Sequence, residues 1–400
     1  MVLSKKIQLE KLLVFCLLVV FPFGQLFRIS IYLQNFRFVI QPLDILAGIF
    51  LFLLLVKRYF LPWFLKPLVL FLIAAAFSFV LSIFFFKNLF WITGFLYLFR
   101  LFAYLSFCIV LWNLLITDKL SRELLFNCLL IISAFAGFFG WIQYLFLPDL
   151  RALKYLGWDD HLYRMVGTFL DPGFLSGILV FGALGALSKV LIKKDFRYLG
   201  VFLFFLITLA FTYSRAGYLA LFAGSFYLFF KTAKAKVFLL LVGLFFLILI
   251  FLPRPNGEGV KLERIFSILA RYENYKGGLA IFSKFPLFGV GYNNICFAKD
   301  ALLGEKEYFS NSCSGLDSSF LLILATTGLV GLLVFLSAVQ KIIYFSKPSF
   351  YKDVLKAISF ALLVHGSFVN SLFYPWILIW VLVVLALTYA KSFAKMPRKE

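Results

Sequence analysis

Apolar runs long enough to cross a bilayer recur along nearly the whole sequence of 400 residues. Each run has roughly 17–25 residues, which as an α-helix matches the hydrocarbon core of a membrane, whereas a membrane β-strand needs only about 9–11. Hydrophobic residues make up 63% of the chain and charged residues 14%, against about 45–50% and about 25% in soluble domains. A soluble core cannot hide this excess. The sequence therefore predicts an all-α integral membrane protein.

The positions of the apolar runs predict about 12 transmembrane helices. Pro22 interrupts the first run, which can therefore be short or re-entrant. The seventh and eighth runs are separated only by Ser214-Arg215 and can instead form one broken helix. The expected helices cover residues 12–27, 42–56, 67–86, 89–116, 123–146, 172–190, 198–213, 216–230, 237–252, 318–340, 355–370 and 373–390.

Basic residues outnumber acidic ones by 39 to 18, which gives a formal net charge of +21. In a soluble protein this balance would suggest nucleic acid, but in a membrane protein Lys and Arg accumulate in cytoplasmic loops and orient the helices. We therefore expect the bilayer and not nucleic acid as a partner, with both termini in the cytoplasm. We expect helices 1–5 in residues 1–150, a core with helices 6–10 in residues 151–345, and helices 11–12 with a basic cytoplasmic tail in residues 346–400.

Two predicted loops on the outer side are the functional candidates. Residues 253–316 form a large loop, expected to contain short helices, of about 60 residues, far beyond the roughly 12–15 residues of an ordinary connector. Residues 147–171 form a second outer loop. Both are basic, against the usual trend, and basic groups there would attract an anion such as a phosphate. Besides the residues discussed below, these loops carry Arg151, Lys154, Arg254, Lys261, Arg264, Lys284, Lys299 and Lys306.

Three arginines lie at or inside predicted spans. Arg164 precedes a span whose first turn would contain Pro172, with Asp171 as its N-cap, and it either reaches lipid headgroups or binds a ligand. In the Ser214-Arg215 step, Arg215 is either a headgroup anchor or a bidentate ligand of phosphate oxygens. Arg100 lies inside a span, where a structural ion pair or snorkelling is expected and a face towards a cavity is the alternative.

The long outer loop contains residues 271–286, in which the residues at 275, 279 and 282 share one helical face. This spacing predicts an amphipathic helix at the membrane interface. The stretch 287–293 that follows is rich in glycine. Its Gly-x-Gly is only weak evidence for a phosphate-binding loop, because no strand precedes it, so a structural turn is predicted. Cys296 and Cys313 share the loop, and a disulfide can form between them in an oxidising compartment.

Asp317 opens the tenth predicted span. It is either an N-cap, whose carboxylate accepts backbone N–H groups, or a general base that faces an outer cavity. The sequence has two histidines. His161 is expected to be an exposed surface group, and His365 a buried packing residue. The acidic residues of the outer loops are scattered rather than paired at metal-ligand spacing, so neither a metal nor a cofactor is expected.

Four motifs, in this order, resemble the O-antigen ligase and O-antigen polymerase superfamily. The stretch from Arg164 to Pro172 is similar to the family's Arg-x-x-Gly-Thr-Phe-x-(Asn/Asp)-Pro, and Ser214-Arg215-Ala216 to its Ser-Arg-(Ala/Gly) step. The stretch from Arg271 to Lys276 is similar to Arg-x-x-x-Trp-Lys, with Tyr275 in place of Trp. This third motif continues at residues 286–291, which match Pro-Leu-x-Gly-x-Gly at the family's spacing. The fourth motif surrounds Gly328, and aligning on it puts Asp317 where the ligases have a His.

The resemblance implies a metal-independent glycosyltransferase of the GT-C type at the periplasmic face of a bacterial inner membrane. Its donor would be a glycan on undecaprenyl diphosphate. The acceptor would be lipid A-core in ligases, another lipid-linked repeat unit in polymerases, or Ser and Thr in related protein glycosyltransferases.

The resemblance also implies roles for single residues. Arg215 and Arg271 would stabilise the leaving diphosphate. Asp317 would be the base, and its departure from the ligase His favours a polymerase, with a ligase as the alternative. The residues expected to bind the diphosphate or the glycan are Arg164, Ser214, Arg264, Tyr275 and Lys276.

A transporter or flippase for lipid-linked sugars is the alternative of another class. It would also combine about twelve spans with a cationic cavity, and such folds often show repeated halves. No repeated halves are visible in this sequence, and its unusual charges gather mainly in one outer loop. This distribution favours the enzyme.

Overall fold

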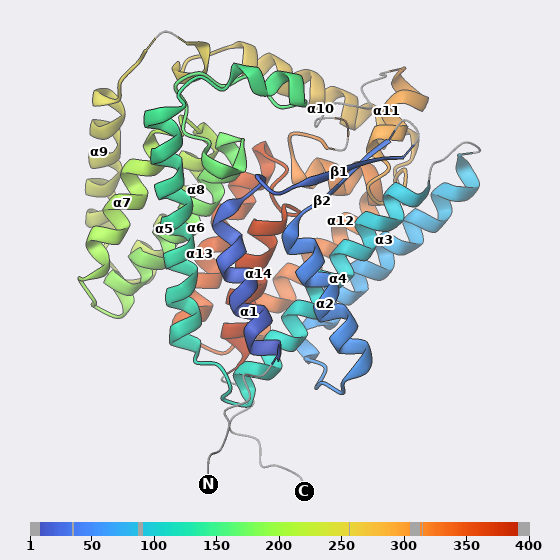
Figure 1. Cartoon of the computed structure of the whole chain (residues 1–400), viewed down its shortest axis with the longest axis horizontal. Coiled ribbons are helices and arrows are strands. Elements are labelled where there is room, and N and C mark those ends of the chain that lie inside the picture. Colours follow the sequence, from blue (N-terminus) through green and yellow to red (C-terminus); the bar gives the residue numbers. More distant parts are fainter. Residues whose placement is uncertain are drawn as a thin grey trace, which may run out of the picture.

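The computed structural model describes residues 9–33, 36–86, 91–255, 257–304, 313 and 315–390, which fold almost entirely into helices (Figure 1). A helix lies at every position where an apolar run predicted one. These helices are α1 (Leu9–Val20), α2 (Pro42–Val56), α3 (Lys66–Phe85), α4 (Trp91–Ile116), α5 (Arg122–Phe146), α6 (Pro172–Ile192), α7 (Tyr198–Ala210), α8 (Arg215–Lys231), α9 (Ala235–Phe251), α12 (Ser319–Phe345), α13 (Phe350–Phe368) and α14 (Pro375–Ala390). The long outer loop adds α10 (Phe266–Lys284) and α11 (Ile295–Leu303).

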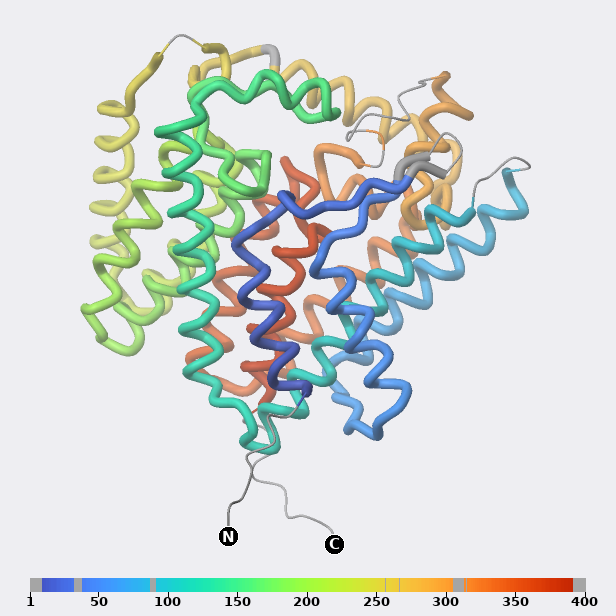
Figure 2. Tube along the Cα trace, in the orientation of Figure 1, coloured from blue at the N-terminus to red at the C-terminus, as the bar shows by residue number. Residues whose placement is uncertain are grey.

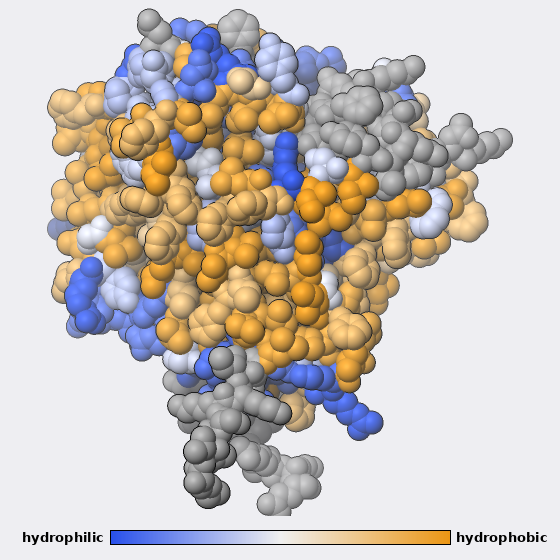
Figure 3. Space-filling model, in the orientation of Figure 1, coloured by the Kyte–Doolittle hydropathy of each residue, from blue (hydrophilic) through white to orange (hydrophobic). Residues whose placement is uncertain are grey.

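Within the described residues, five helical segments are long and apolar enough to cross a membrane, and several shorter helices are also apolar. Figure 3 shows a broad hydrophobic band with hydrophilic residues above and below it. Such a band is expected of side chains that face lipid. The chain is therefore a multi-pass membrane protein. The long segments are Trp63–Phe85, Trp91–Ile116, Arg122–Phe146, Pro172–Ile192 and Ser319–Phe345.

α6 lies inside the bundle and is buried along almost its whole length. It packs against α5, α7, α8 and α13, and Figure 2 shows these segments around it. Small residues let helix backbones approach closely. A β-carbon on Gly182 would lie 2.6 Å from the ring of Phe205, and one on Gly224 would lie 2.4 Å from Leu184 Cδ1. The glycines of α6 and α8 therefore permit the close packing that places the outer ends of these helices together.

The region after α1 differs from the prediction. α1 ends at Val20, and Pro22 lies in a 3₁₀ turn (Phe21–Phe23), so the first helix is shorter than the apolar run. The chain then forms an antiparallel hairpin of β1 (Ile29–Leu33) and β2 (Phe36–Ile40), which was not predicted. In Figure 1 this hairpin crosses the bundle just below α10 and α11. By contrast, α7 and α8 are two separate helices, as the boundaries of their apolar runs predicted.

The glycine-rich stretch after α10 is a structural turn, as predicted. The N–H of Val290 donates to the carbonyl oxygen of Ala325 at 3.0 Å. α12 is kinked at this point, since Gly328 has φ 67° and ψ −172°. A β-carbon on Gly328 would lie only 2.2 Å from the carbonyl oxygen of Leu287. The two glycine motifs therefore dock on each other and fix the end of α10 against α12.

Arg100 forms the structural ion pair expected of a charge inside a span. Its Nη2 lies 2.7 Å from Asp44 Oδ2, and the hydroxyl of Tyr104 donates to Asp44 Oδ1 at 2.8 Å. The same carboxylate accepts the backbone N–H of Gln41 at 2.7 Å, at the start of α2. The fold thus neutralises this charge internally.

Candidate active site

Four arginines of the outer region lie close enough to interact electrostatically: Arg164, Arg215, Arg264 and Arg271. Arg164 lies before α6, and Arg215 is the first residue of α8. Arg264 precedes α10, and Arg271 lies in it. Figure 1 shows α10 lying across one end of the helix bundle. The fold thus brings together four of the residues that the sequence predicted. We call them the arginine cluster.

Arg164 and Arg264 are held by the turn between α7 and α8. Arg164 donates to the carbonyl oxygens of Thr212 at 3.2 Å and Tyr213 at 3.3 Å, and Arg264 Nη2 donates to the same Tyr213 oxygen at 3.3 Å. Tyr213 has φ 50°, a left-handed conformation that costs a residue with a β-carbon about 1–2 kcal/mol. Arg264 Nη1 donates to two more carbonyl oxygens in the preceding turn. The backbone therefore fixes both guanidinium groups.

Arg215 and Arg271 are less enclosed by backbone. Arg215 Nη1 donates to the carbonyl oxygen of Leu262 at 3.1 Å, and its Nη2 to Ser267 Oγ at 2.6 Å. Arg271 has no side-chain hydrogen bond or ion pair within the part of the chain that the structure describes. A guanidinium carries five N–H donors in a planar fork. Arg271 therefore has the most donors left for a ligand.

None of the four arginines forms an ion pair with a carboxylate among the described residues, although the charges of Asp171 and Asp159 act on Arg164 from further away. Burial, together with the charge of Arg271, lowers the pKa of Arg164 to about 10. Burial and the other three guanidinium groups lower the pKa of Arg264 to about 9. Both remain cations at neutral pH. Like charges held together in a partly buried site favour the binding of an anion.

The sequence left two roles open for Asp317, the N-cap of α12 and a general base. Ser318 caps α12, because its Oγ accepts the N–H of Leu321 at 3.3 Å, so the N-cap alternative for Asp317 is wrong. The backbone N–H of Asp317 donates to Asn274 Oδ1 in α10 at 2.8 Å. Burial raises the pKa of the Asp317 carboxyl, while Arg271 lowers it. A buried carboxyl of raised pKa that is free of the cap can accept a proton.

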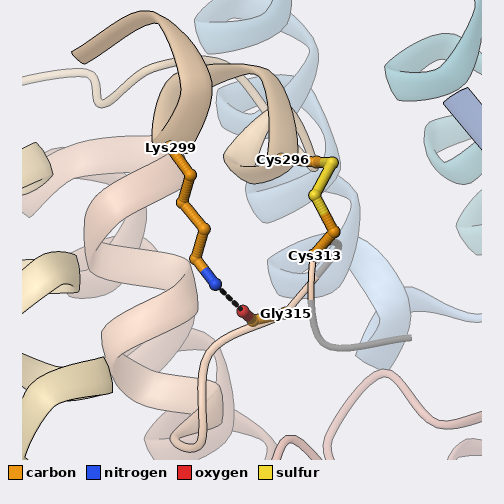
Figure 4. Close-up of a disulfide and its surroundings, with 4 residues drawn as sticks. All are labelled: Cys296, Lys299, Cys313 and Gly315. Carbon is orange, nitrogen blue, oxygen red and sulfur yellow. Dashed lines mark hydrogen bonds between the residues drawn. A yellow bond between two sulfur atoms is a disulfide. The ribbon is translucent and has the colours of Figure 1, made fainter. Parts of the chain in front are cut away.

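Cys296 and Cys313 form the disulfide that the sequence allowed (Figure 4). Their Cα atoms are 4.8 Å apart. Beside the disulfide, Lys299 Nζ donates to the carbonyl oxygen of Gly315 at 3.3 Å (Figure 4). These two links attach α11 to the segment just before Asp317. They therefore restrict where the carboxyl of Asp317 can lie.

Two predicted binding residues make structural hydrogen bonds. Ser214 is the N-cap of α8, and its Oγ accepts the N–H of Gly217 at 3.3 Å. The hydroxyl of Tyr275 donates to the carbonyl oxygen of Ser367 at 2.6 Å, which joins α10 to the end of α13. Both residues border the arginine cluster in the chain, and both hold the elements that carry it.

The described contacts of Lys276 do not include the arginine cluster. Its side chain is exposed, and its Nζ lies 3.8 Å from the carboxylate of Glu273. On the face predicted to be apolar, Leu279 is 52% exposed, as a side chain at the membrane interface can be, whereas Ile281, which was not assigned to that face, is fully buried. α10 is packed along Gly278 and Ile281 because that side contacts α12.

One of the two predictions for histidines is wrong. His161 is buried rather than exposed. Burial, with the charges of Arg164 and Arg264, lowers its pKa to about 3, so the imidazole is neutral at physiological pH. His365 is buried as predicted, and its Nε2 lies 3.1 Å from the carbonyl oxygen of Gly173.

The loop before α6 supplies two carboxylates near the cluster. Asp171 is the N-cap of α6, as predicted, and its Oδ1 accepts the N–H of Phe174 at 2.9 Å. Asp159, which sequence reasoning missed, interacts electrostatically with Arg164 and raises the pKa of Asp317. Asn274 was also missed, because a single amide in a helix carries no motif. Within the described ranges, no group of three His, Cys, Asp or Glu is arranged to hold a metal ion.

Residues 200–336 match the family model described as O-antigen ligase. The matched region runs from α7 into α12 and includes Arg215, Arg264, Arg271 and Asp317, whereas Arg164 precedes it. No curated protein matches the chain. The similarity to the O-antigen ligase family is thus a domain over residues 200–336.

Proposed function

We propose that the protein transfers a glycan from undecaprenyl diphosphate to an acceptor hydroxyl at the outer face of a bacterial inner membrane. The observation that carries this proposal is the arginine cluster, which forms no ion pair in the described structure and interacts electrostatically with the partly buried carboxyl of Asp317. The family match supports glycan transfer. The disulfide supports an outer location, because disulfides persist in oxidising compartments.

In the proposed reaction, the arginine cluster binds the diphosphate through charge-assisted hydrogen bonds. Asp317 accepts the proton of the acceptor hydroxyl as that oxygen bonds to the anomeric carbon of the donor sugar. The bond from the anomeric carbon to the phosphate oxygen breaks, and undecaprenyl diphosphate leaves with the electron pair. Arg215 and Arg271 stabilise the negative charge on the leaving group. Fixed guanidinium groups supply the positive charge in this scheme, so it requires no metal ion.

The proposed acceptor is another lipid-linked repeat unit, which makes the protein a polymerase. Asp317 supports this choice, because the ligase pattern has a His at that place in the motif. A ligase that uses lipid A-core remains the second candidate, since the matched family model is described as O-antigen ligase. Expression in a host that lacks its own polymerase distinguishes the two. Ladders of repeat length support the polymerase, and core carrying a single unit supports the ligase.

Glycosidic bond formation by the purified protein in detergent tests the proposal against transport. The donor is the lipid-linked repeat unit extracted from the host, and EDTA is present. We expect elongated product and released undecaprenyl diphosphate. A protein that yields no product in detergent but moves the lipid-linked sugar across liposomes would be a flippase.

Asp317→Asn tests the proposed base while keeping the size of the side chain. We expect the rate of transfer to fall by about 10²–10⁴-fold, the usual contribution of a positioned base. Asp317→Glu should retain more activity than Asp317→Asn, because it keeps the carboxylate. Normal turnover in Asp317→Asn would show that the residue has no part in proton transfer.

A further inference from the structure

A polar cavity of about 220 Å³ lies beside the candidate active site and has no role in the reaction described above. Its walls come from segments that the family match does not cover, together with the start of α12 and the loop before α11. An engineered protein cavity of about 150 Å³ is large enough to hold the six-membered ring of benzene. The cavity is therefore large enough for a ring of that size. Its characteristic lining residues are Gln25, Gln41, Trp158, Asn293, Asn370 and Tyr374.

The side chains around the cavity leave polar atoms without protein partners. Gln41 Oε1 and Asn370 Oδ1 are buried acceptors, and Trp158 Nε1 and Asn293 Nδ2 are buried donors, with no hydrogen bond to any described residue. Unpaired buried polar atoms are costly. A ligand rich in hydroxyl groups would satisfy both kinds, because each hydroxyl donates and accepts.

A hydrogen-bonded chain orients one of these acceptors. Gln41 Nε2 donates to Gln25 Oε1 at 2.6 Å, and Gln25 Nε2 donates to the hydroxyl of Tyr374 at 3.2 Å. The Tyr374 ring in turn stacks on Phe174, with ring centroids 3.9 Å apart. Gln41 is only 4% exposed. Because the amide nitrogen of Gln41 is engaged in this chain, its oxygen is the atom left unpaired.

Aromatic rings and two arginines complete the cavity. Tyr97, Tyr292 and Trp158 line it, and the guanidinium of Arg28 lies 4.5 Å from the Trp158 ring centroid. Arg100 also lines the cavity, but Asp44 neutralises it. The neighbouring cavity of about 150 Å³ is instead lined almost wholly by apolar side chains, as expected within a membrane bundle. Two neighbouring cavities of one bundle thus differ in the polarity of their lining.

The cavity adjoins the proposed base through two chain segments. Gly315 lines it and lies two residues before Asp317. Trp158 directly precedes Asp159, whose charge raises the pKa of Asp317. The arginine cluster interacts with the same Asp317 through Arg271. Asp317 thus lies near both the arginine cluster and the cavity.

We propose that this cavity binds the sugar of the acceptor that is to be extended, with its reacting hydroxyl directed to Asp317. This inference rests on the proposed function, because it assigns the acceptor of the same reaction. Aromatic faces would pack on the apolar faces of the sugar ring. The unpaired amide and indole atoms would hydrogen-bond to its hydroxyl groups.

Binding of the repeat-unit oligosaccharide, released from the host's lipid carrier by mild acid, tests the proposal without requiring turnover. The purified protein in nanodiscs is compared with Trp158→Ala and Asn370→Leu by saturation-transfer NMR. We expect each variant to weaken binding roughly tenfold or more, on the scale of a lost hydrogen bond at a buried partner. Tyr155→Ala is the matched control, because Tyr155 is 92% exposed in the same loop and does not line the cavity.

The affinity for inorganic pyrophosphate is measured on the same samples and should stay unchanged in both cavity variants. Unaltered oligosaccharide binding in Trp158→Ala and Asn370→Leu would overturn the proposal. A loss of pyrophosphate affinity equal to that of Arg271→Ala would also overturn it and assign the cavity to the donor phosphates. A different outcome is that the wild type binds the sugar but forms no glycosidic bond, while the cavity variants lose sugar binding. In that case the cavity is a saccharide site and the proposed function fails.

Discussion

Arg100 and the arginine cluster show two ways in which one protein places guanidinium groups in buried surroundings. Arg100 lies inside a span and has the carboxylate of Asp44 at 2.7 Å. In the arginine cluster, Arg164, Arg215 and Arg264 are held by backbone carbonyl oxygens and a serine hydroxyl, and none of the four arginines forms an ion pair in the described structure. A charge needed only by the fold is neutralised within the fold. A group of guanidinium charges without ion pairs instead favours an anionic ligand.

The largest expected effect is on stability and concerns the paired arginine. Asp44→Asn leaves the Arg100 charge buried without its partner, which typically costs about 3–5 kcal/mol. We expect the thermal unfolding temperature in detergent to fall strongly. The affinity for pyrophosphate should be unchanged in the folded fraction. A variant that keeps the wild-type unfolding temperature would show that the pair contributes little to stability.

The next largest effect is on catalysis and concerns the arginine cluster. Arg271→Ala and Arg215→Ala should each lower the rate of transfer by about 10²–10³-fold, the usual result of removing a group that stabilises developing charge. Arg→Lys at either position should also be poor, because the planar fork is lost. Arg151→Ala is the matched control, since Arg151 is an outer arginine that is already paired with Asp149 at 2.6 Å. Full activity in Arg215→Ala or Arg271→Ala would contradict the proposed role of that arginine in stabilising the leaving group.

Anion binding should stabilise the protein through the cluster. Pyrophosphate at 100 times its dissociation constant should add about 2.7 kcal/mol to the free energy of unfolding, because it binds only the folded state. This stabilisation should persist in EDTA and disappear in Arg271→Ala. Thermal unfolding over a pyrophosphate titration measures it. An equal gain in the wild type and in Arg271→Ala would contradict binding at the cluster.

The pH dependence of transfer tests whether Asp317, next to the arginine cluster, acts as the base. Burial raises the pKa of its carboxyl above the ordinary value of 3.8, and Arg271 partly opposes that rise. A base must be deprotonated, so kcat/KM should fall as the pH drops through a value above 3.8. Replacing Arg271 with Ala should move the acid limb of the residual activity further upwards. An acid limb at or below pH 3.8 in the wild type would contradict a buried base.

The smallest expected effect concerns Lys276, whose exposed side chain lies near Glu273. Exposed ion pairs contribute at most about 1 kcal/mol. Lys276→Ala should therefore change the rate of transfer by less than about fivefold. A loss comparable to that of Arg271→Ala would show that Lys276 moves into the cluster when substrate binds.

The sequence predicted the helices well because each apolar run reports on one helix without reference to its neighbours. Pro22 correctly indicated a short first helix, but the hairpin that follows was missed. The burial of His161 was also missed. It results from packing beside Arg164 and Arg264, and no local pattern in the chain records that packing.

Part of the candidate site could also be predicted. Arg164, Arg215, Arg264 and Arg271 stand out in the sequence because basic residues are rare on the outer side of membrane proteins. The contact between Asn274 and Asp317 requires the fold, because α10 and α12 are distant in the chain. The polar cavity also requires the fold, since its residues come from many separate segments.

The most direct test of the account is the binding of undecaprenyl diphosphate and undecaprenyl monophosphate to the purified protein in nanodiscs with EDTA present. The arginine cluster should favour the diphosphate, because four cations face a ligand with more negative charge. Arg271→Ala should lose this preference, whereas Arg151→Ala should keep it. Equal affinity for the two lipids in the wild type, or an unchanged preference in Arg271→Ala, would contradict the claim that the outer arginines hold the phosphates of the carrier.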